Sequence, residues 1–197
     1  MVTTEPTDFG YTGMHAFVFI DSVDPGTNIR TVVNALREFG PPPRGPVMFA
    51  SEMVGSSLGF AHLRVEDDDL AGLQGLIANE LWDRGVHCSY CIEAETARRG
   101  EHRQGVKRQT PEIIAIVRIR AQQGALDGVL GRLADPEGPL KTTFKGASVV
   151  YGDIDILLQL GGNDFSTVAR AVYGPLQDIE GIADTDTLFT DARRYDV

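Results

Sequence analysis

The second half of the chain alternates β-branched runs with amphipathic segments. Valine and isoleucine runs predict strands, and leucine and valine at helical spacing predict helices. Gly152 and Asp153 are typical of a hairpin turn, and Asp164 is typical of a helix N-cap. The pattern predicts the order β-α-β-β-α-β over residues 113–119, 125–133, 144–151, 154–160, 165–176 and 182–189.

The first half repeats this pattern. Its predicted elements have the same order and cover residues 14–20, 29–39, 47–54, 58–65, 69–82 and 86–92. Turn and cap residues recur 95 to 97 positions apart, as in the pairs Gly55 and Gly152, Asp69 and Asp164. We therefore expect a tandem duplication of a ferredoxin-like βαββαβ unit in an α+β fold.

The predicted units cover residues 14–94 and 111–191, and a basic linker over 95–110 joins them. In each unit the apolar stripes of two helices would cover one face of a four-stranded antiparallel sheet. The other face is also apolar, with Phe17, Phe19 and Phe49 among its residues. We expect the sheets to pack face to face as an α/β barrel, within one chain or between two, and expect a homo-oligomer.

Composition narrows the classes of function. The chain has 197 residues, 42% of them hydrophobic, and a net charge of −10, which disfavours sequence-independent binding to nucleic acid. No apolar run reaches the length of a membrane span, and residues 1–13 do not look like a secretory signal. Two cysteines cannot form a disulfide framework, so the chain is expected in the reducing cytoplasm. No membrane partner is expected.

Two motifs of the second half resemble the effector-binding domain of Lrp/AsnC-type regulators. They are Tyr151-Gly-Asp-Ile-Asp-Ile156 and Gly181-Ile-Ala-Asp-Thr-Asp-Thr187. The resemblance implies a member of the dimeric α/β-barrel superfamily that binds an amino acid or a related metabolite. Its implied ligand-binding residues are Gly152, Asp153 and Asp155, with Gly55, Ser56 and Ser57 at the corresponding turn of the first half.

Residues 1–13 are too short for a helix-turn-helix, so direct DNA binding is not expected. Our main prediction is a stand-alone effector-binding and oligomerisation module. It would regulate through a partner, for example by hetero-oligomerising with a homologous regulator.

Two other classes stay open: a cofactor-poor monooxygenase or isomerase of the dimeric α/β-barrel type, and a structural adaptor oligomer. The enzyme would need polar groups inside the barrel, and His62, His87 and Glu52 are the candidates. Cys88 and Cys91 fall in a predicted strand, where residues three apart point to opposite faces. We therefore expect no metal site and no cofactor.

Overall fold

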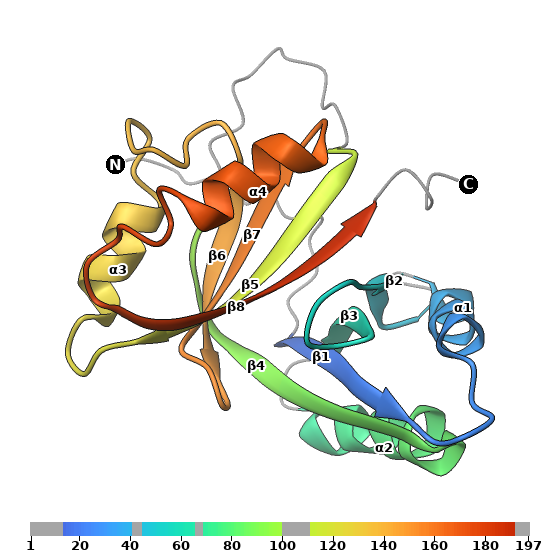
Figure 1. The fold of residues 1–197 in the computed structure, drawn as a ribbon. Helices are drawn as coiled ribbons and strands as arrows, with labels where there is room; N and C mark the ends of the chain where they lie inside the picture. The colour runs from blue at the N-terminus through green and yellow to red at the C-terminus, as the bar shows by residue number, and fades with distance from the viewer. Residues whose placement is uncertain (1–13, 41–44, 66–68, 100–110, 192–197) are drawn as a thin grey trace.

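Eight antiparallel strands and four α-helices make up the part of the chain that the computed structural model describes, residues 14–40, 45–65, 69–99 and 111–191 (Figure 1). Each half has the predicted order β-α-β-β-α-β. The elements are β1 (Met14–Val23), α1 (Ile29–Phe39), β2 (Val47–Glu52), β3 (Gly59–Val65), α2 (Leu70–Glu80), the 3-10 turn η1 (Trp82–Arg84), β4 (Val86–Arg99), β5 (Ile113–Ala121), α3 (Leu126–Leu133), β6 (Phe144–Tyr151), β7 (Ile156–Gly162), α4 (Phe165–Tyr173) and β8 (Ile182–Asp191).

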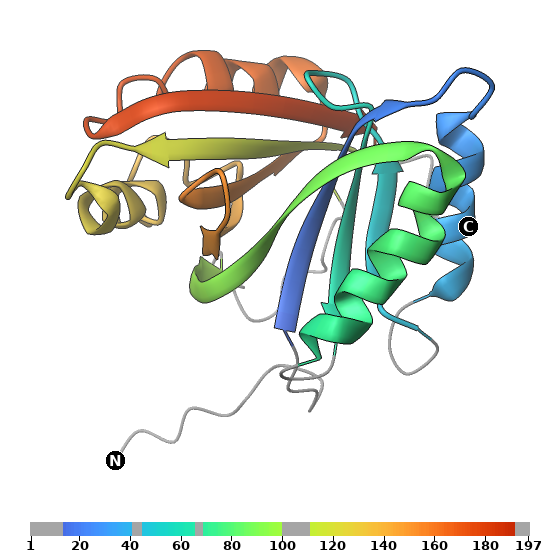
Figure 2. The ribbon, with the colours of Figure 1, turned by 90° about the horizontal axis from the view of Figure 1, so that it is seen from below.

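The strands form one sheet in the order β2-β3-β1-β4-β6-β7-β5-β8. This corrects the prediction of two separate four-stranded sheets. The reason lies in β4, which continues past its predicted end and pairs with β6 from Ile92–Tyr151 to Arg99–Gly146. Figures 1 and 2 show β4 in green, curving from one half of the molecule into the other.

The first five residues of the predicted linker are therefore strand, and residues 100–110 lie outside the described part of the chain. The division into two repeats at 14–94 and 111–191 stays a prediction.

The two edges of the sheet meet within the chain. The Val54 amide donates to the Phe189 carbonyl at 2.8 Å, and the Phe189 amide donates to the Val54 carbonyl at 2.9 Å. Next to this bridge the hydroxyls of Ser51 and Thr190 lie 2.6 Å apart, and both residues are buried. We call this junction between the ends of β2 and β8 the seam.

Side chains alternate between two environments along each strand. On β1, Ala16, Val18 and Ile20 pack with α1 and α2, whereas Phe17 and Phe19 point to the inner face of the sheet. The helices lie outside the curved sheet in both views (Figures 1 and 2). The inner cluster combines both halves: Phe17, Phe19, Met53, Phe60, Cys91, Ile116, Val150, Leu157 and Leu188.

Helix starts follow the cap residues. The side chains of Asp69 and Asp164 accept hydrogen bonds from the backbone amides of Gly72 and Thr167, both at 2.8 Å, which confirms these two predicted N-caps. The hydroxyl and amide of Thr167 lower the pKa of Asp164.

None of the helices in the described ranges is long and apolar enough to span a membrane.

Gly55 lets the loop after β2 approach β8, and its replacement tests the seam. Its φ is +152°, and an added Cβ would lie 2.7 Å from the backbone oxygen of Thr187. We expect Gly55→Ala to lower the free energy of unfolding by about 1–3 kcal/mol, measured by chemical denaturation.

Gly75 provides the matched control, since it lies inside α2 with no atom within 4 Å of an added Cβ. Gly75→Ala should raise the free energy of unfolding by about 0.5–1 kcal/mol. A Gly55→Ala protein as stable as the wild type would show that the close contact at the seam does not matter.

Candidate functional site

At one end of the inner face the side chains change from apolar to polar, and a cavity of about 240 Å³ opens there. Its floor is apolar and its wall carries charges of both signs. The lining residues are Phe19, Ser89, Tyr90, Cys91, Arg118, Arg120, Asp153, Ile154, Asp184 and Asp186. We call this cavity the pocket.

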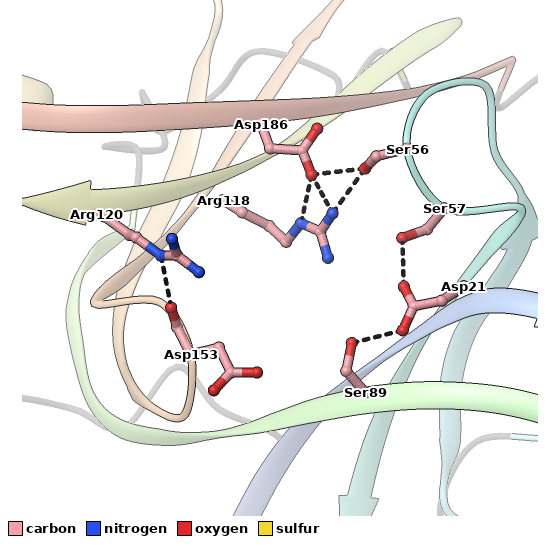
Figure 3. A network of polar contacts seen from close by, with 8 residues as sticks. All are labelled: Asp21, Ser56, Ser57, Ser89, Arg118, Arg120, Asp153 and Asp186. Carbon is pink, nitrogen blue, oxygen red and sulfur yellow. Dashed lines mark hydrogen bonds and ion pairs between the residues drawn. The ribbon is translucent and has the colours of Figure 1, made fainter.

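Arg118 of β5 is held from several sides (Figure 3). Its Nε donates to Asp186 at 2.8 Å and its Nη2 to the Ser56 hydroxyl at 2.6 Å, while Ser56 donates to Asp186 at 2.6 Å. The guanidinium also lies over the Phe19 ring, 4.8 Å from its centre. With 18% of its side chain exposed, Arg118 keeps a largely buried positive charge beside the pocket.

Arg120 and Asp153 form the adjacent wall. The Arg120 Nε donates to the backbone oxygen of Asp153 at 2.9 Å, which ties the β6–β7 turn to β5. In Figure 3 the Asp153 carboxylate points away from Arg120, into the open space on the side of Ser89. Among the described residues, no hydrogen bond reaches this carboxylate, so its oxygens are available to a ligand.

The opposite wall is built around Asp21 at the end of β1. One oxygen of its carboxylate accepts from the Ser57 hydroxyl and the other from the Ser89 hydroxyl, each at 2.9 Å. Ser57 is 1% exposed, whereas Ser89 lines the pocket. Asp21 thus fixes two serines from two different segments in one orientation.

Cys91 lies on the floor of the pocket. Burial raises the pKa of its thiol to about 12, and the nearby Arg118 lowers it less than burial raises it. The Asp153 carboxylate adds to the increase, which means that its charge acts on the same small space. The thiol is therefore neutral at physiological pH and is not a nucleophile there.

This state of Cys91 can be checked by alkylation with iodoacetamide in a Cys88→Ala background. A thiol with a pKa of about 12 should react about a thousandfold more slowly at pH 8 than a free cysteine. Its rate should keep rising above pH 9. Because the pKa is raised on folding, the buried thiol stabilises the fold below pH 9.0, and this contribution is lost as the pH rises towards 12. A rate that levels off at or below pH 9 would contradict the assignment.

The turns at residues 55–57 and 152–153, which carry predicted ligand-binding residues, lie at this same end of the sheet. Ser56 contacts Arg118 and Asp186, Ser57 contacts Asp21, and Asp153 lines the pocket. Their role in ligand binding stays a prediction.

The other three predicted ligand-binding residues have structural contacts. Gly55 packs against β8, and an added Cβ on Gly152 would lie 2.9 Å from that of Cys91. The Asp155 carboxylate accepts from the Ala121 amide at 2.8 Å, so it holds the hairpin to the end of β5.

The structure does not bring His62, His87 and Glu52 together. The sequence placed His62 and His87 on neighbouring strands, but β1 lies between β3 and β4, so they are separated by a strand. His62, His87 and Glu52 instead contact His15 at 2.7 Å, Asp24 at 2.9 Å and Arg30 at 2.9 Å, respectively.

Sequence reasoning missed the charged pairs of the pocket. Arg118 and Arg120 lie on one face of β5, directly opposite Asp186 and Asp184 of β8. The available signal was the alternation Arg-Ile-Arg in one strand and Asp-Thr-Asp in another, with opposite charges at period two. Matching them required the strand register, which the two motifs alone do not determine.

Comparison with known proteins identifies the fold. No family model matches the chain, and no curated protein matches it. Solved structures do, over nearly the whole length. An anthrone oxidase-like protein aligns with a TM-score of 0.57 at 10% identity, covering 93% of this chain and 94% of the other. A variant chlorite dismutase from Candidatus Nitrospira defluvii aligns with a TM-score of 0.55 at 10% identity over 90% of each chain.

A heme-binding protein from Thermus thermophilus aligns with a TM-score of 0.52 at 11% identity, covering 89% of this chain and 90% of that one. At these identities the likeness establishes the fold alone.

These neighbours show that the resemblance to Lrp/AsnC domains is wrong. The main prediction, a regulatory effector-binding module, rested on this resemblance and is wrong too. The physical reason is that residues of both motifs make structural contacts in this fold. Gly152 and Asp155 make the hairpin, and Asp186 pairs with Arg118. The amino-acid ligand and the regulator partner lose their support too, while the homo-oligomer stays a prediction.

The described residues of the pocket do not fit a heme. Heme iron takes an axial histidine, thiolate or tyrosinate ligand. Neither a histidine nor a methionine lines the pocket, burial disfavours the thiolate of Cys91, and the Tyr90 side chain packs in the helix-side core. Within the described ranges no group of three His, Cys, Asp or Glu could hold a metal ion. His102 lies outside those ranges.

Proposed function

We propose that this chain is a cofactor-poor α/β-barrel enzyme, with the seam closing the sheet into the barrel. It removes a proton from a carbon atom that is conjugated to a carbonyl group, and O2 then oxidises the product. The observation that carries the proposal is that two guanidinium groups and a carboxylate to which no described residue donates a hydrogen bond line one small pocket with an apolar floor. The likeness to an anthrone oxidase-like protein supports this class over a binding module.

The charges of the pocket residues determine their proposed roles. Removing a proton from such a carbon acid leaves negative charge on the conjugated carbonyl oxygen. Arg118 is fixed beside the pocket, so it can stabilise that oxyanion without reorganising. Arg120 adds a second positive charge next to it on the same face of β5.

Asp153 is the proposed base. Carboxylates act as general bases when they lie within hydrogen-bond reach of the proton to be removed. Asp186 is engaged by Arg118 and Ser56, which leaves Asp153 and Asp184 among the carboxylates that line the pocket. We assign the base to Asp153, because it lies on the β6–β7 turn next to Ile154, which lines the pocket with apolar surface. Phe19 and Ile154 supply apolar surface for a ring.

The oxidation balances without another electron donor. One CH2 group and one O2 give one C=O group and one water, so all four electrons come from the substrate carbon. The chain binds and orients the substrate, takes the proton on the Asp153 carboxylate and stabilises the anion. The volume of about 240 Å³ is below the roughly 300–1,000 Å³ of most ligand pockets, which favours a small ring compound.

Anthrone is a suitable probe for this proposal, since its CH2 group is acidic and its product is a quinone. We expect the purified protein to accelerate O2 uptake and quinone formation in equal amounts, with no added cofactor and no loss of rate in a metal chelator. Arg132→Met removes an exposed ion pair with Glu180 and is the control that should keep the full rate. O2 uptake no faster than in buffer would overturn the proposal.

A further inference from the structure

We propose that Ser89, held by Asp21, recognises a hydroxyl group on the substrate of the pocket. The inference rests on the proposed function, because it assigns a specificity-determining residue to the same site. It identifies the substrate class as a ring compound with a carbonyl at one end and a neutral hydroxyl group at the other.

The single hydroxyl proton of Ser89 determines which hydrogen bonds this residue can make. A hydroxyl group has one proton to donate and two lone pairs that accept. The Ser89 proton is directed to Asp21 at 2.9 Å, and the second oxygen of Asp21 is occupied by Ser57 at the same distance. Ser89 therefore presents lone pairs to the pocket that it lines, and it can accept a hydrogen bond but not donate one.

The facing wall has the opposite character. Arg118 and Arg120 can only donate, and they lie across the pocket from Ser89 (Figure 3). A ligand that satisfies both walls must accept at the arginines and donate at Ser89. A carbonyl or oxyanion meets the first need, and a hydroxyl group meets the second.

The charge of Asp21 sharpens this choice. Its carboxylate lies directly behind Ser89, so a phenolate or carboxylate at that wall would meet like charge. A hydrocarbon edge would leave the lone pairs of Ser89 without a donor. Both alternatives are penalised, and the neutral hydroxyl group is favoured.

The test compares two probes, anthrone and a hydroxyanthrone with its phenol on an outer ring. We expect the wild type to prefer the hydroxyanthrone about tenfold in kcat/KM and in affinity, a typical effect of one hydrogen bond. Ser89→Ala should abolish this preference by lowering the values for the hydroxyanthrone to about those for anthrone. As a single substitution, Asp21→Asn should weaken the preference for the hydroxyanthrone. Added to Ser89→Ala, it should have no further effect on the preference, as expected of a residue that acts through Ser89.

Ser148 offers a matched control, since it also donates to a carboxylate, that of Glu93 at 2.5 Å, and does not line the pocket. Ser148→Ala should keep the preference. Equal binding of the two probes by wild type and Ser89→Ala, or no binding of either, would overturn the inference. Selective binding without turnover would overturn the proposed function and leave the Ser89 assignment standing. Turnover that depends on Asp153, with a preference for the hydroxyanthrone that survives in Ser89→Ala, would do the reverse.

Discussion

Asp153→Asn should reduce kcat for anthrone oxidation by about 10²–10⁴, the usual contribution of a general base. The amide keeps the size of the side chain but cannot take the proton. The backbone oxygen of Asp153, which accepts from Arg120, is untouched, so the turn should keep its place. The free energy of unfolding should stay within about 0.5 kcal/mol of the wild type, as for other surface changes. Steady-state kinetics and chemical denaturation measure both quantities.

Asp184→Asn is the matched control for this experiment. Asp184 lines the same pocket and lies opposite Arg120 in the strand register, but it comes from β8 rather than from the β6–β7 turn. We expect its replacement to change kcat by less than about tenfold, because it removes a neighbouring charge and not the base. The opposite ranking of the two variants would place the base on Asp184 and contradict the assignment.

Arg118→Met should reduce kcat by about 10²–10³, comparable to the removal of one donor to a developing oxyanion. Methionine keeps an apolar stem but offers no positive charge over the Phe19 ring. Asp186 loses its partner, yet 35% of its side chain is exposed and water can replace the guanidinium. The loss of stability should therefore be about 1 kcal/mol or less.

Arg118→Lys separates charge from geometry. A lysine can pair with Asp186 but lacks the fork that contacts Ser56 and Asp186 together. We expect its kcat to lie between those of the wild type and Arg118→Met. If Arg118→Met kept the full kcat while losing stability, Arg118 would be a structural residue and the oxyanion site would lie elsewhere.

Much of the fold could be predicted because local patterns determine it. The apolar stripes predict the helices, and caps such as Asp69 and Asp164 start two of them where expected. The extension of β4 could not be predicted in this way. Its residues 95–99 were predicted as part of the basic linker, but they form a strand because β6 offers them an unpaired edge.

The sequence named some residues at the end of the sheet where the pocket lies, but on a resemblance that is wrong. Ser56, Ser57 and Asp153 were implied by the likeness to Lrp/AsnC domains, and their role in ligand binding stays a prediction. Their partners come from distant segments, as Arg118 and Asp186 are 68 positions apart and meet only through the pairing of β5 with β8. The register also decides that Ser89 faces the pocket, which no local pattern indicates.

The most direct test of the central claim is hydrogen exchange at the substrate carbon without oxygen. Anthrone in D2O, under anaerobic conditions, should exchange its CH2 protons faster with the wild-type protein than in buffer alone, followed by proton NMR. Asp153→Asn should slow the protein-dependent exchange by the same factor as it slows oxidation. Protein-dependent exchange in the wild type that disappears in Asp153→Asn is the predicted result. The absence of any exchange above the buffer rate, with anthrone bound, would contradict the account.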